Sequence, residues 1–273
     1  YACCGVDENK MGRDLEGITL KSIGQPVRRK EDARLLTGKG KFTDDFSLEG
    51  QSYAVMVRSP HAHALLKGFD LEAALAMPGV LGIFTGADLE ADGVNPIPHS
   101  PVPKTKYDMK LKGPGGTEIF IGPHVLLPTD KARHVGEAVA MVIAESVNEA
   151  LDAAEVVEVD YETLDHVTET AKTFEPGQPL VWDEAENNTL VDTVFGDVAA
   201  TDAAFAAAKH VVEKTLYVGR VTGVPLEPRA ALAAYDAAED SYTIYAGSGG
   251  AVRQKAEMSN VINIDPEKLR VVS

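Results

Sequence analysis

Apolar and polar residues alternate in several short stretches of the first half of the chain, and this spacing predicts β-strands. The alternation runs through residues 51–58 and returns in 62–66, and Val80–Phe84 forms a third apolar stretch. Between them, Asp70 is placed to cap a short helix that Pro78 and Gly79 would end. We therefore expect short strands separated by turns and one small helix.

The clearest unit follows a Pro- and Gly-rich stretch, residues 95–122, that predicts a long loop. Val139–Ala144 is a continuous apolar strand, and residues 146–149 read as a capping box in which Glu149 reaches back to the Ser146 amide. The helix that begins there has its apolar face at Ala150, Ala153, Ala154 and Val157. Residues 157–161 alternate as a strand, so the pattern predicts a strand–helix–strand crossover in a mixed sheet.

The second half predicts another set of elements. An Ala-rich helix is expected from residue 196 to about 208, and a further helix over 252–261. Four strands are expected, at 211–218, 230–235, 242–245 and 269–273. Helices beside short strands indicate an α+β fold.

Composition and charge limit the kinds of molecule that this protein can be expected to bind. Apolar residues make up 44% of the 273 residues and charged residues 25%, as in ordinary globular proteins. A net charge of −16 repels phosphate backbones, which argues against nucleic-acid binding. Apolar runs are too short to span a bilayer. The adjacent Cys3 and Cys4 suit neither a metal cluster nor a structural disulfide, and two reduced thiols indicate a cytoplasmic protein.

A few residues are candidates for chemistry. His61 and His63 would share one face of a strand, as a metal-ligand pair or a polar strand edge. The stretch 38–41 is a turn rather than a phosphate loop. Gly247-Ser248-Gly249-Gly250 follows a strand and precedes a helix, where backbone amides could approach a cofactor, although a tight turn is the alternative. Glu227 and Arg229 could form a salt bridge or point into a pocket.

Four segments in order resemble the large, molybdopterin-binding subunit of the xanthine dehydrogenase, aldehyde oxidase and carbon monoxide dehydrogenase family. Residues 23–45, with Ile23-Gly24-Gln25-Pro26-Val27-Arg28-Arg29, are similar to its entry segment. Arg58-Ser59-Pro60-His61-Ala62-His63-Ala64 and the stretch 129–140, with Val135-Gly136-Glu137-Ala138, resemble its α/β hammerhead domain. Val224-Pro225-Leu226-Glu227-Pro228-Arg229 resembles the opening of its first molybdopterin-binding domain.

The resemblance implies a domain organisation: an extended N-terminal arm (1–35), the hammerhead domain (36–168), a linker (169–190) and an incomplete beginning of the first molybdopterin-binding domain (191–273). It implies a molybdenum-containing molybdopterin, in the cytosine dinucleotide form, bound largely by parts not present here. Gly247, Ser248, Gly249 and Gly250 become candidate cofactor-binding residues, and Glu227 and Arg229 pocket-floor or structural residues.

In function, the resemblance implies oxidation of an N-heterocycle or an aldehyde with water-derived oxygen. Electrons would pass to 2Fe-2S and FAD cofactors in partner subunits, within a higher oligomer that also holds the remainder of the molybdopterin subunit. The chain by itself is expected to be inactive. The alternative is a non-catalytic docking module that holds the iron–sulfur and flavin subunits.

Two departures from the family pattern qualify this expectation. Gly249 stands where the family usually places a glutamine that touches the metal's oxo group. The sequence ends at Arg270-Val271-Val272-Ser273, where the resemblance implies continuation into a glycine-rich loop. The family's catalytic glutamate has no counterpart here, so no residue is assigned as catalytic.

Overall fold

The computed structural model describes most of the chain: residues 14–15, 18–19, 24, 29–98, 109–219, 221–225, 227 and 229–273. Cys3 and Cys4 lie outside the described residues. The chain divides into two compact units, residues 1–46 and 47–273. Within the described part, no helix combines the length and apolar character needed to cross a membrane.

The described residues of the first unit form short elements only. Strands β1 (Asp14–Leu15) and β2 (Ile18–Thr19) pair antiparallel. Helix α1 (Asp32–Leu36) begins inside the segment expected to be an extended arm (1–35) and ends one residue beyond it, and a 3-10 turn spans Thr43–Asp45. At the start of α1, the Asp32 carboxylate accepts hydrogen bonds from the Arg29 amide and from its Nε, at 3.1 and 3.2 Å. This contact stabilises the turn just before a helix that is only five residues long.

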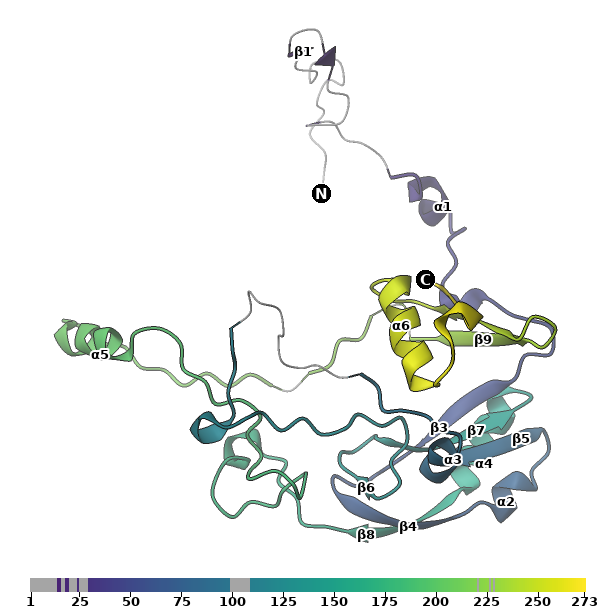
Figure 1. Ribbon diagram of the computed structural model, residues 1–273, viewed down its shortest axis with the longest axis horizontal. Helices are drawn as coiled ribbons and strands as arrows, with labels where there is room; N and C mark the ends of the chain where they lie inside the picture. Colours follow the sequence, from purple (N-terminus) through teal and green to yellow (C-terminus); the bar gives the residue numbers. More distant parts are fainter. Residues whose placement is uncertain are drawn as a thin grey trace. The chain divides into compact units, whose positions relative to one another are not determined.

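Two small antiparallel sheets form the first part of the second unit (Figure 1). In one, β7 (Ala138–Ala144) lies between β3 (Tyr53–Arg58) and β5 (Val80–Thr85). In the other, β4 (Ala64–Asp70) lies between β6 (Lys131–Ala132) and β8 (Glu158–Thr163). The strands expected from alternation over 51–58 and 80–84, and from the apolar run 139–144, are therefore confirmed.

The expected strand–helix–strand crossover is wrong. Strand β7 and strand β8 flank helix α4 (Val147–Val156) in the sequence but belong to different sheets. Both edges of β7 are already occupied, by β3 and β5, so no ladder position is open to β8. Strand β8 pairs instead with β4, antiparallel. Each strand has only two edges, and the alternation pattern does not say which neighbours will take them.

Helix α4 covers the β3–β7–β5 sheet and supplies its core. Ala153 is fully buried against Ala140 and Val142 of β7, with Val157 8% exposed beside them. The short helices α2 (Glu72–Leu75) and α3 (Gly86–Ala91) lie next to β5. The small side chains that face inward explain how the helix approaches the sheet closely.

Two predicted caps differ in detail from the structure. Ser146 caps α4, since its Oγ accepts from the Glu149 amide at 3.2 Å, as expected. Glu149 does not reach the Ser146 amide; its Oε2 accepts a hydrogen bond from the Ser146 hydroxyl at 2.7 Å. Asp70 accepts from the Glu72 amide at 3.1 Å, while Leu71 occupies the N-cap position of α2. Both polar residues still satisfy amides that a helix leaves free.

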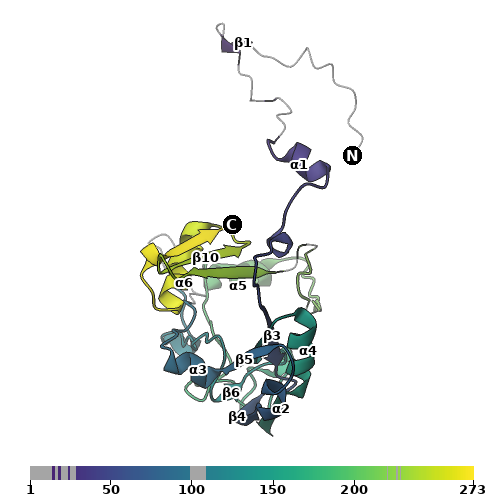
Figure 2. The same ribbon diagram turned by 90° about the vertical axis from the view of Figure 1, so that its right-hand side faces the viewer.

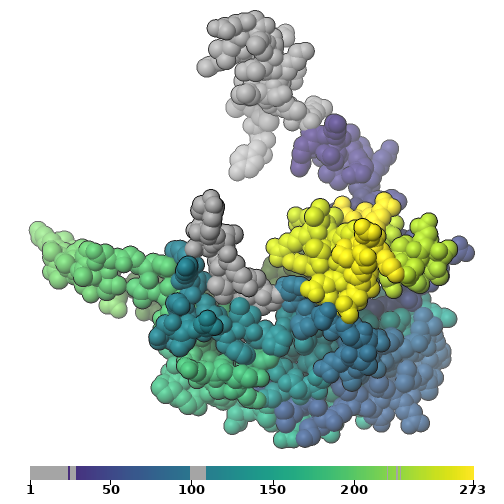
Figure 3. Space-filling model, in the orientation of Figure 1, coloured from purple at the N-terminus to yellow at the C-terminus, as the bar shows by residue number. Residues whose placement is uncertain are grey.

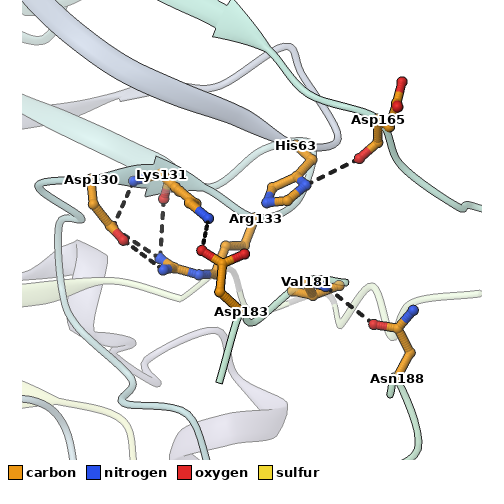
Figure 4. A network of polar contacts seen from close by, with 8 residues as sticks. All are labelled: His63, Asp130, Lys131, Arg133, Asp165, Val181, Asp183 and Asn188. Atoms are coloured by element: carbon orange, nitrogen blue, oxygen red, sulfur yellow. Dashed lines mark hydrogen bonds and ion pairs between the residues drawn. The ribbon is translucent and has the colours of Figure 1, made fainter. Parts of the chain in front are cut away.

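The segment around Trp182 is held against the β6 region by charged and aromatic contacts, of which Figure 4 shows the charged ones. Lys131 Nζ contacts Asp183 Oδ2 at 2.5 Å. The Arg133 guanidinium carbon lies 3.9 Å from the centroid of the Trp182 ring, and its two terminal nitrogens donate to Asp130 at 3.1 and 2.7 Å. The carboxylate holds the guanidinium within its own plane, and the aromatic ring holds it from one face, so the Arg133 side chain has little freedom to move.

The expected long loop around residues 95–122 is described only in part, since 99–108 lie outside the described residues. Its described portion has a single 3-10 turn, Pro114–Gly116, and another such turn spans Thr170–Lys172. At Gly122 an added Cβ would lie 2.3 Å from Trp182 Cε2. The loop can therefore pass Trp182 only because this position has no side chain.

A third sheet of the second unit, which is mixed, lies near the end of the sequence (Figure 2). Its order is β11 (Leu269–Val272), β10 (Ser241–Ala246), β9 (Ala231–Asp236); β10 pairs antiparallel with β9 and parallel with β11. Helix α6 (Ala251–Val261) and a 3-10 turn, Pro266–Lys268, connect β10 to β11. Leu269 is 1% exposed and packs with Ile244 and Ala246. The strands expected at 230–235, 242–245 and 269–273, and the helix at 252–261, are confirmed.

The expected strand at 211–218 does not form. Helix α5 (Val198–Ala207) is present as predicted, with Asp197 Oδ1 accepting from the Ala200 amide at 2.8 Å. The described residues after it, from Lys209 to Gly219, belong to no helix or strand, and the structure records no backbone hydrogen bond for them. A strand is stable only when a neighbour accepts its ladder hydrogen bonds.

Candidate cofactor-binding site

The turn between β10 and α6 is the segment that the sequence predicts to approach a cofactor. It consists of residues 247–250, all exposed, and leads directly into α6. Gly250 is the N-cap of that helix and has a φ of 156°, a conformation that side chains with a Cβ rarely adopt. The backbone conformation therefore explains why residue 250 is a glycine.

A serine pair holds the turn against the end of the last sheet strand. The Ser248 amide and hydroxyl contact Ser273 Oγ at 3.3 and 3.2 Å, and the Ser273 hydroxyl donates to the Ser248 carbonyl at 3.3 Å. The Gly250 amide in turn donates to Ser248 Oγ at 3.2 Å. This chain of hydrogen bonds fixes the turn before any ligand is present.

A cavity of about 350 Å³ opens at this turn, lined by Ser248, Gly249, Gly250, Arg253, Gln254 and Glu257. An ideal Cβ on Gly249 would meet no atom within 4 Å, so there is free space directly over the backbone. Gly247 is not among the lining residues. The cavity thus collects three of the four predicted cofactor-binding residues.

The polar groups of the cavity suit a ligand that carries N–H donors. Gln254 Oε1 is buried and has no hydrogen-bond partner among the described residues. Arg253 Nε donates to Glu257 Oε1 at 2.7 Å, so the two charges compensate each other. Because the beginning of a helix also attracts anions, the site fits a group with N–H donors and a phosphate, as a molybdopterin has. Buried acceptors in proteins nearly always have a hydrogen-bond donor, so the unpaired Gln254 Oε1 indicates that a ligand supplies one.

The lining residues of α6 could have been found from the sequence. Positions 250, 253, 254 and 257 are spaced by three or four residues and so share one face of a helix. The glycine-rich turn is predicted to bind a cofactor, whereas the residues after it are predicted only to form a helix.

Glu227 and Arg229 are not brought to this cavity. Both are exposed, and neither forms an ion pair in the described part of the chain. A pocket-floor role for either residue stays a prediction.

The histidine pair precedes β4 rather than lying within it. His63 is 8% exposed, and its Nδ1 lies 3.2 Å from the Asp165 carbonyl oxygen (Figure 4). The His61 ring instead meets the Tyr161 ring edge-on, with the centroids 4.9 Å apart. The described residues contain no group of three or more metal-ligating side chains. His61 and His63 therefore contact different partners.

Two family descriptions match the sequence, in order. Residues 37–165 match the aldehyde oxidase and xanthine dehydrogenase a/b hammerhead domain, and residues 181–273 match the molybdopterin cofactor-binding domain. The turn at 247–250 and its cavity lie inside the second match.

Curated relatives extend the similarity to nearly the whole chain. The nicotine 6-hydroxylase large subunit of Paenarthrobacter nicotinovorans is 36% identical over 94% of this chain and 29% of its own length. The carbon monoxide dehydrogenase large chain of Hydrogenophaga pseudoflava is 30% identical over 96% of this chain and 32% of its own length. The chain thus spans about a third of the length of these relatives.

Solved structures agree in fold. Quinoline 2-oxidoreductase from Pseudomonas putida 86 superposes with a TM-score of 0.76 at 29% identity, over 90% of this chain and 29% of that chain. Reconstituted carbon monoxide dehydrogenase from Oligotropha carboxidovorans gives a TM-score of 0.76 at 28% identity, over 93% and 31%. With both domains matched in the same order as in these large subunits, the chain belongs to the xanthine dehydrogenase, aldehyde oxidase and carbon monoxide dehydrogenase family of molybdopterin-binding large subunits.

Proposed function

We propose that this protein supplies the hammerhead domain and part of the cofactor-binding domain of a molybdenum-containing hydroxylase that oxidises an N-heterocycle with water-derived oxygen. The observation that carries the proposal is the cavity at the Gly-rich turn, which lies inside the stretch matching a molybdopterin cofactor-binding domain. The likeness to subunits named for nicotine and quinoline favours an N-heterocycle over the other expected substrate class, an aldehyde.

In this proposal the residues of the chain bind and orient the cofactor. Gly249 and Gly250 let the backbone approach it closely, Gln254 Oε1 accepts an N–H of the pterin, and the first amides of α6 hold a phosphate oxygen. The Arg253–Glu257 pair keeps the lining close to neutral. When bound, the molybdopterin supplies a metal centre for oxygen transfer to the substrate and for uptake of its electrons.

The proposal extends to the partners and to the cofactor form. Electrons would leave through 2Fe-2S and FAD subunits of a cytoplasmic complex, and the polypeptide would be inactive without them and without the remainder of the large subunit. The resemblance to bacterial chains favours the cytosine dinucleotide form of molybdopterin. No residue of this chain is proposed as the catalytic base.

A substitution at Gly249 tests the proposal. Because free space surrounds this position and its φ is not positive, we expect Gly249→Val to fold normally in the cofactor-free chain. In the protein purified with its associated polypeptides, the same side chain would occupy cofactor space and lower the molybdenum content by about tenfold. Metal analysis and mass spectrometry of the released pterin measure this.

The matched control is Gly68→Val, at another glycine with free space and no positive φ. We expect it to retain the wild-type molybdenum content. Equal molybdenum in both variants would refute the cofactor role of the turn. Wild-type protein that co-purifies with iron–sulfur and flavin subunits but holds no molybdenum would favour the alternative, a non-catalytic docking module.

A further inference from the structure

A second cavity lies mostly in the part of the chain that matches the hammerhead domain. Its volume is about 290 Å³, and it is lined by residues of α3 and the loop after it, of the segment 123–133 and of the segment around Trp182. It shares no lining residue with the cavity at the turn 247–250. This volume is close to the lower limit of about 300 Å³ for small-molecule sites, which suits a ligand of one or two rings.

Close contacts between its segments fix the walls of the cavity. At Gly86, the first residue of α3, an added Cβ would lie 2.6 Å from the Pro128 carbonyl oxygen, so two backbones meet there without a side chain between them. The Thr129 hydroxyl donates to Glu90 Oε1 at 2.9 Å and joins α3 to the same segment a second time. Figure 3 shows the yellow atoms of α6 beside the blue atoms of the α3 segment, where the Asn95 amide donates to a carbonyl at the end of α6 at 2.7 Å. The cavity is therefore formed before a ligand arrives.

Most of the lining is apolar. Leucine, valine and proline residues together with Trp182 make up most of it; Leu127 is only 6% exposed and Pro128 is fully buried. Such walls stabilise a ligand by removing its apolar groups from water, and they offer nothing to a small hydrated ion.

The charged residues of the lining leave two carboxylates uncompensated. Arg133 donates to Asp130 through both terminal nitrogens, so this pair adds no net charge to the cavity. Glu90 and Glu184, both exposed, form no ion pair with any of the described residues. An apolar cavity with two negative groups in its lining favours a positive charge carried by an apolar molecule.

We propose that this cavity binds a small organic cation, namely a protonated amine or protonated N-heterocycle with one or two rings. The rings lie against the apolar walls, and the positive nitrogen faces Glu90 and Glu184. A lysine side chain of another polypeptide fits less well, because its compact, strongly hydrated ammonium group and flexible stem would leave much of the apolar wall uncovered. The inference goes beyond the proposed function, since it involves neither molybdenum nor the turn at 247–250.

Isothermal titration calorimetry of the 273-residue chain with three matched probes tests the proposal. The probes are benzylamine, which is protonated at neutral pH, its neutral counterpart benzyl alcohol and its anionic counterpart benzoate. We expect benzylamine to bind about tenfold or more tightly than benzyl alcohol, and benzoate not to bind. Trp182 is the single tryptophan of the chain and lines the cavity, so its emission should change along the same saturation curve.

A pair of variants locates the site. Glu90→Gln/Glu184→Gln removes both charges with little change of shape, and should bring the affinities for benzylamine and benzyl alcohol within about twofold of each other. The control, Glu155→Gln/Glu186→Gln, removes two charges from exposed glutamates outside the lining and should keep the tenfold preference. Urea midpoints show whether both variants fold as the wild type does, and the comparison of probes on the wild type depends on neither variant.

Three results would each overturn the proposal: no saturable binding of benzylamine, equal binding of benzylamine and benzyl alcohol, or a preference that survives in Glu90→Gln/Glu184→Gln. Tighter binding of lysine amide acetylated at its α-nitrogen than of benzylamine would also overturn it, and would identify the cavity as a contact for a protein side chain. Because no probe involves molybdenum, these results are independent of the Gly249→Val experiment.

Discussion

Trp182 is the single tryptophan of the chain, and its position depends on a glycine. Arg133 stacks on one side of the ring, and Phe120 meets it edge-on with centroids 6.0 Å apart. An added Cβ at Gly122 would lie 2.3 Å from Cε2 and 2.4 Å from Cζ2 of this ring. Rigid aromatic atoms cannot yield by that amount without movement of the whole side chain.

Gly122→Ala is therefore expected to displace Trp182 and to lower the free energy of unfolding by about 1–3 kcal/mol. With one tryptophan in the chain, its emission spectrum reports the displacement directly, as a shift to longer wavelength. Gly68→Ala, where free space surrounds the added methyl group, should leave the spectrum unchanged. Identical emission and urea midpoints in both variants would contradict this account.

The carboxyl group of Asp130 makes the stability of the fold depend on pH. Partial burial raises the pKa of its carboxyl group, but hydrogen bonds from the Arg133 side chain and the Lys131 amide outweigh burial, and the pKa lies below the usual 3.8. A pKa lowered in the folded state contributes stability that is present above the unfolded value and is lost as the pH falls through the folded value.

The free energy of unfolding should consequently decline more steeply with acidification below about pH 4 in the wild type than in Asp130→Asn. Urea unfolding between about pH 5 and about pH 3 measures the difference, which should become smaller towards the acid end. Parallel curves for the two proteins across this range would show that Asp130 makes no such contribution.

At the scale of elements, two helices of equal length have similar caps but different surroundings. Ser146 caps α4, in which Ala150 and Ala153 are buried, and Asp197 caps α5, which buries nothing. A cap stabilises its helix in either case, but only a packed helix passes that stabilisation to the rest of the fold.

Ser146→Ala is expected to lower the free energy of unfolding by about 1 kcal/mol, measured by urea denaturation. Asp197→Ala, in the isolated chain, should leave the global value unchanged and increase only the amide exchange rates within α5. An equal loss of global stability from both substitutions would mean that α5 is packed in solution.

At the scale of the whole molecule, hydrogen bonds across a long sequence separation join the hammerhead segment to the end of α6 within the second unit. The Asn95 amide donates to the Val261 carbonyl at 2.7 Å, and Asn95 Nδ2 donates to the Asn260 carbonyl at 2.8 Å. These carbonyls belong to the last turn of the helix, where no intrahelical donor remains. The helix that begins at the candidate cofactor turn is thus held at its other end by residue 95.

Asn95→Ala should lower the free energy of unfolding by about 0.5–1.5 kcal/mol, since one of the two hydrogen bonds is lost. Asn95→Asp should lower it further at neutral pH, because a carboxylate would then face the Asn260 carbonyl oxygen. Chemical denaturation compares the variants with Asn187→Ala, in which only a local contact to the Thr189 amide disappears. A rank order with Asn95→Asp as the mildest change would contradict the assigned contacts.

Much of the local structure follows from the sequence alone. The strands around 53–58, 80–85 and 138–144 and the helices after Ser146 and Asp197 could be predicted because alternation and capping act over a few neighbouring residues. The Gly-rich turn was likewise placed correctly between a strand and a helix. The family resemblance, read from four short segments, is confirmed by the two domain matches.

Only the tertiary structure decided which strands pair, because ladder partners are chosen by edges that the one-dimensional pattern does not contain. It separated β7 from β8, left residues 211–218 without a partner, and directed His63 to the Asp165 carbonyl and His61 to Tyr161. It also brought Trp182 against Gly122 and Asn95 to the end of α6, contacts that span 60 and 165 positions. Local sequence determines what each segment can form; long-range packing determines which of those segments obtain a neighbour.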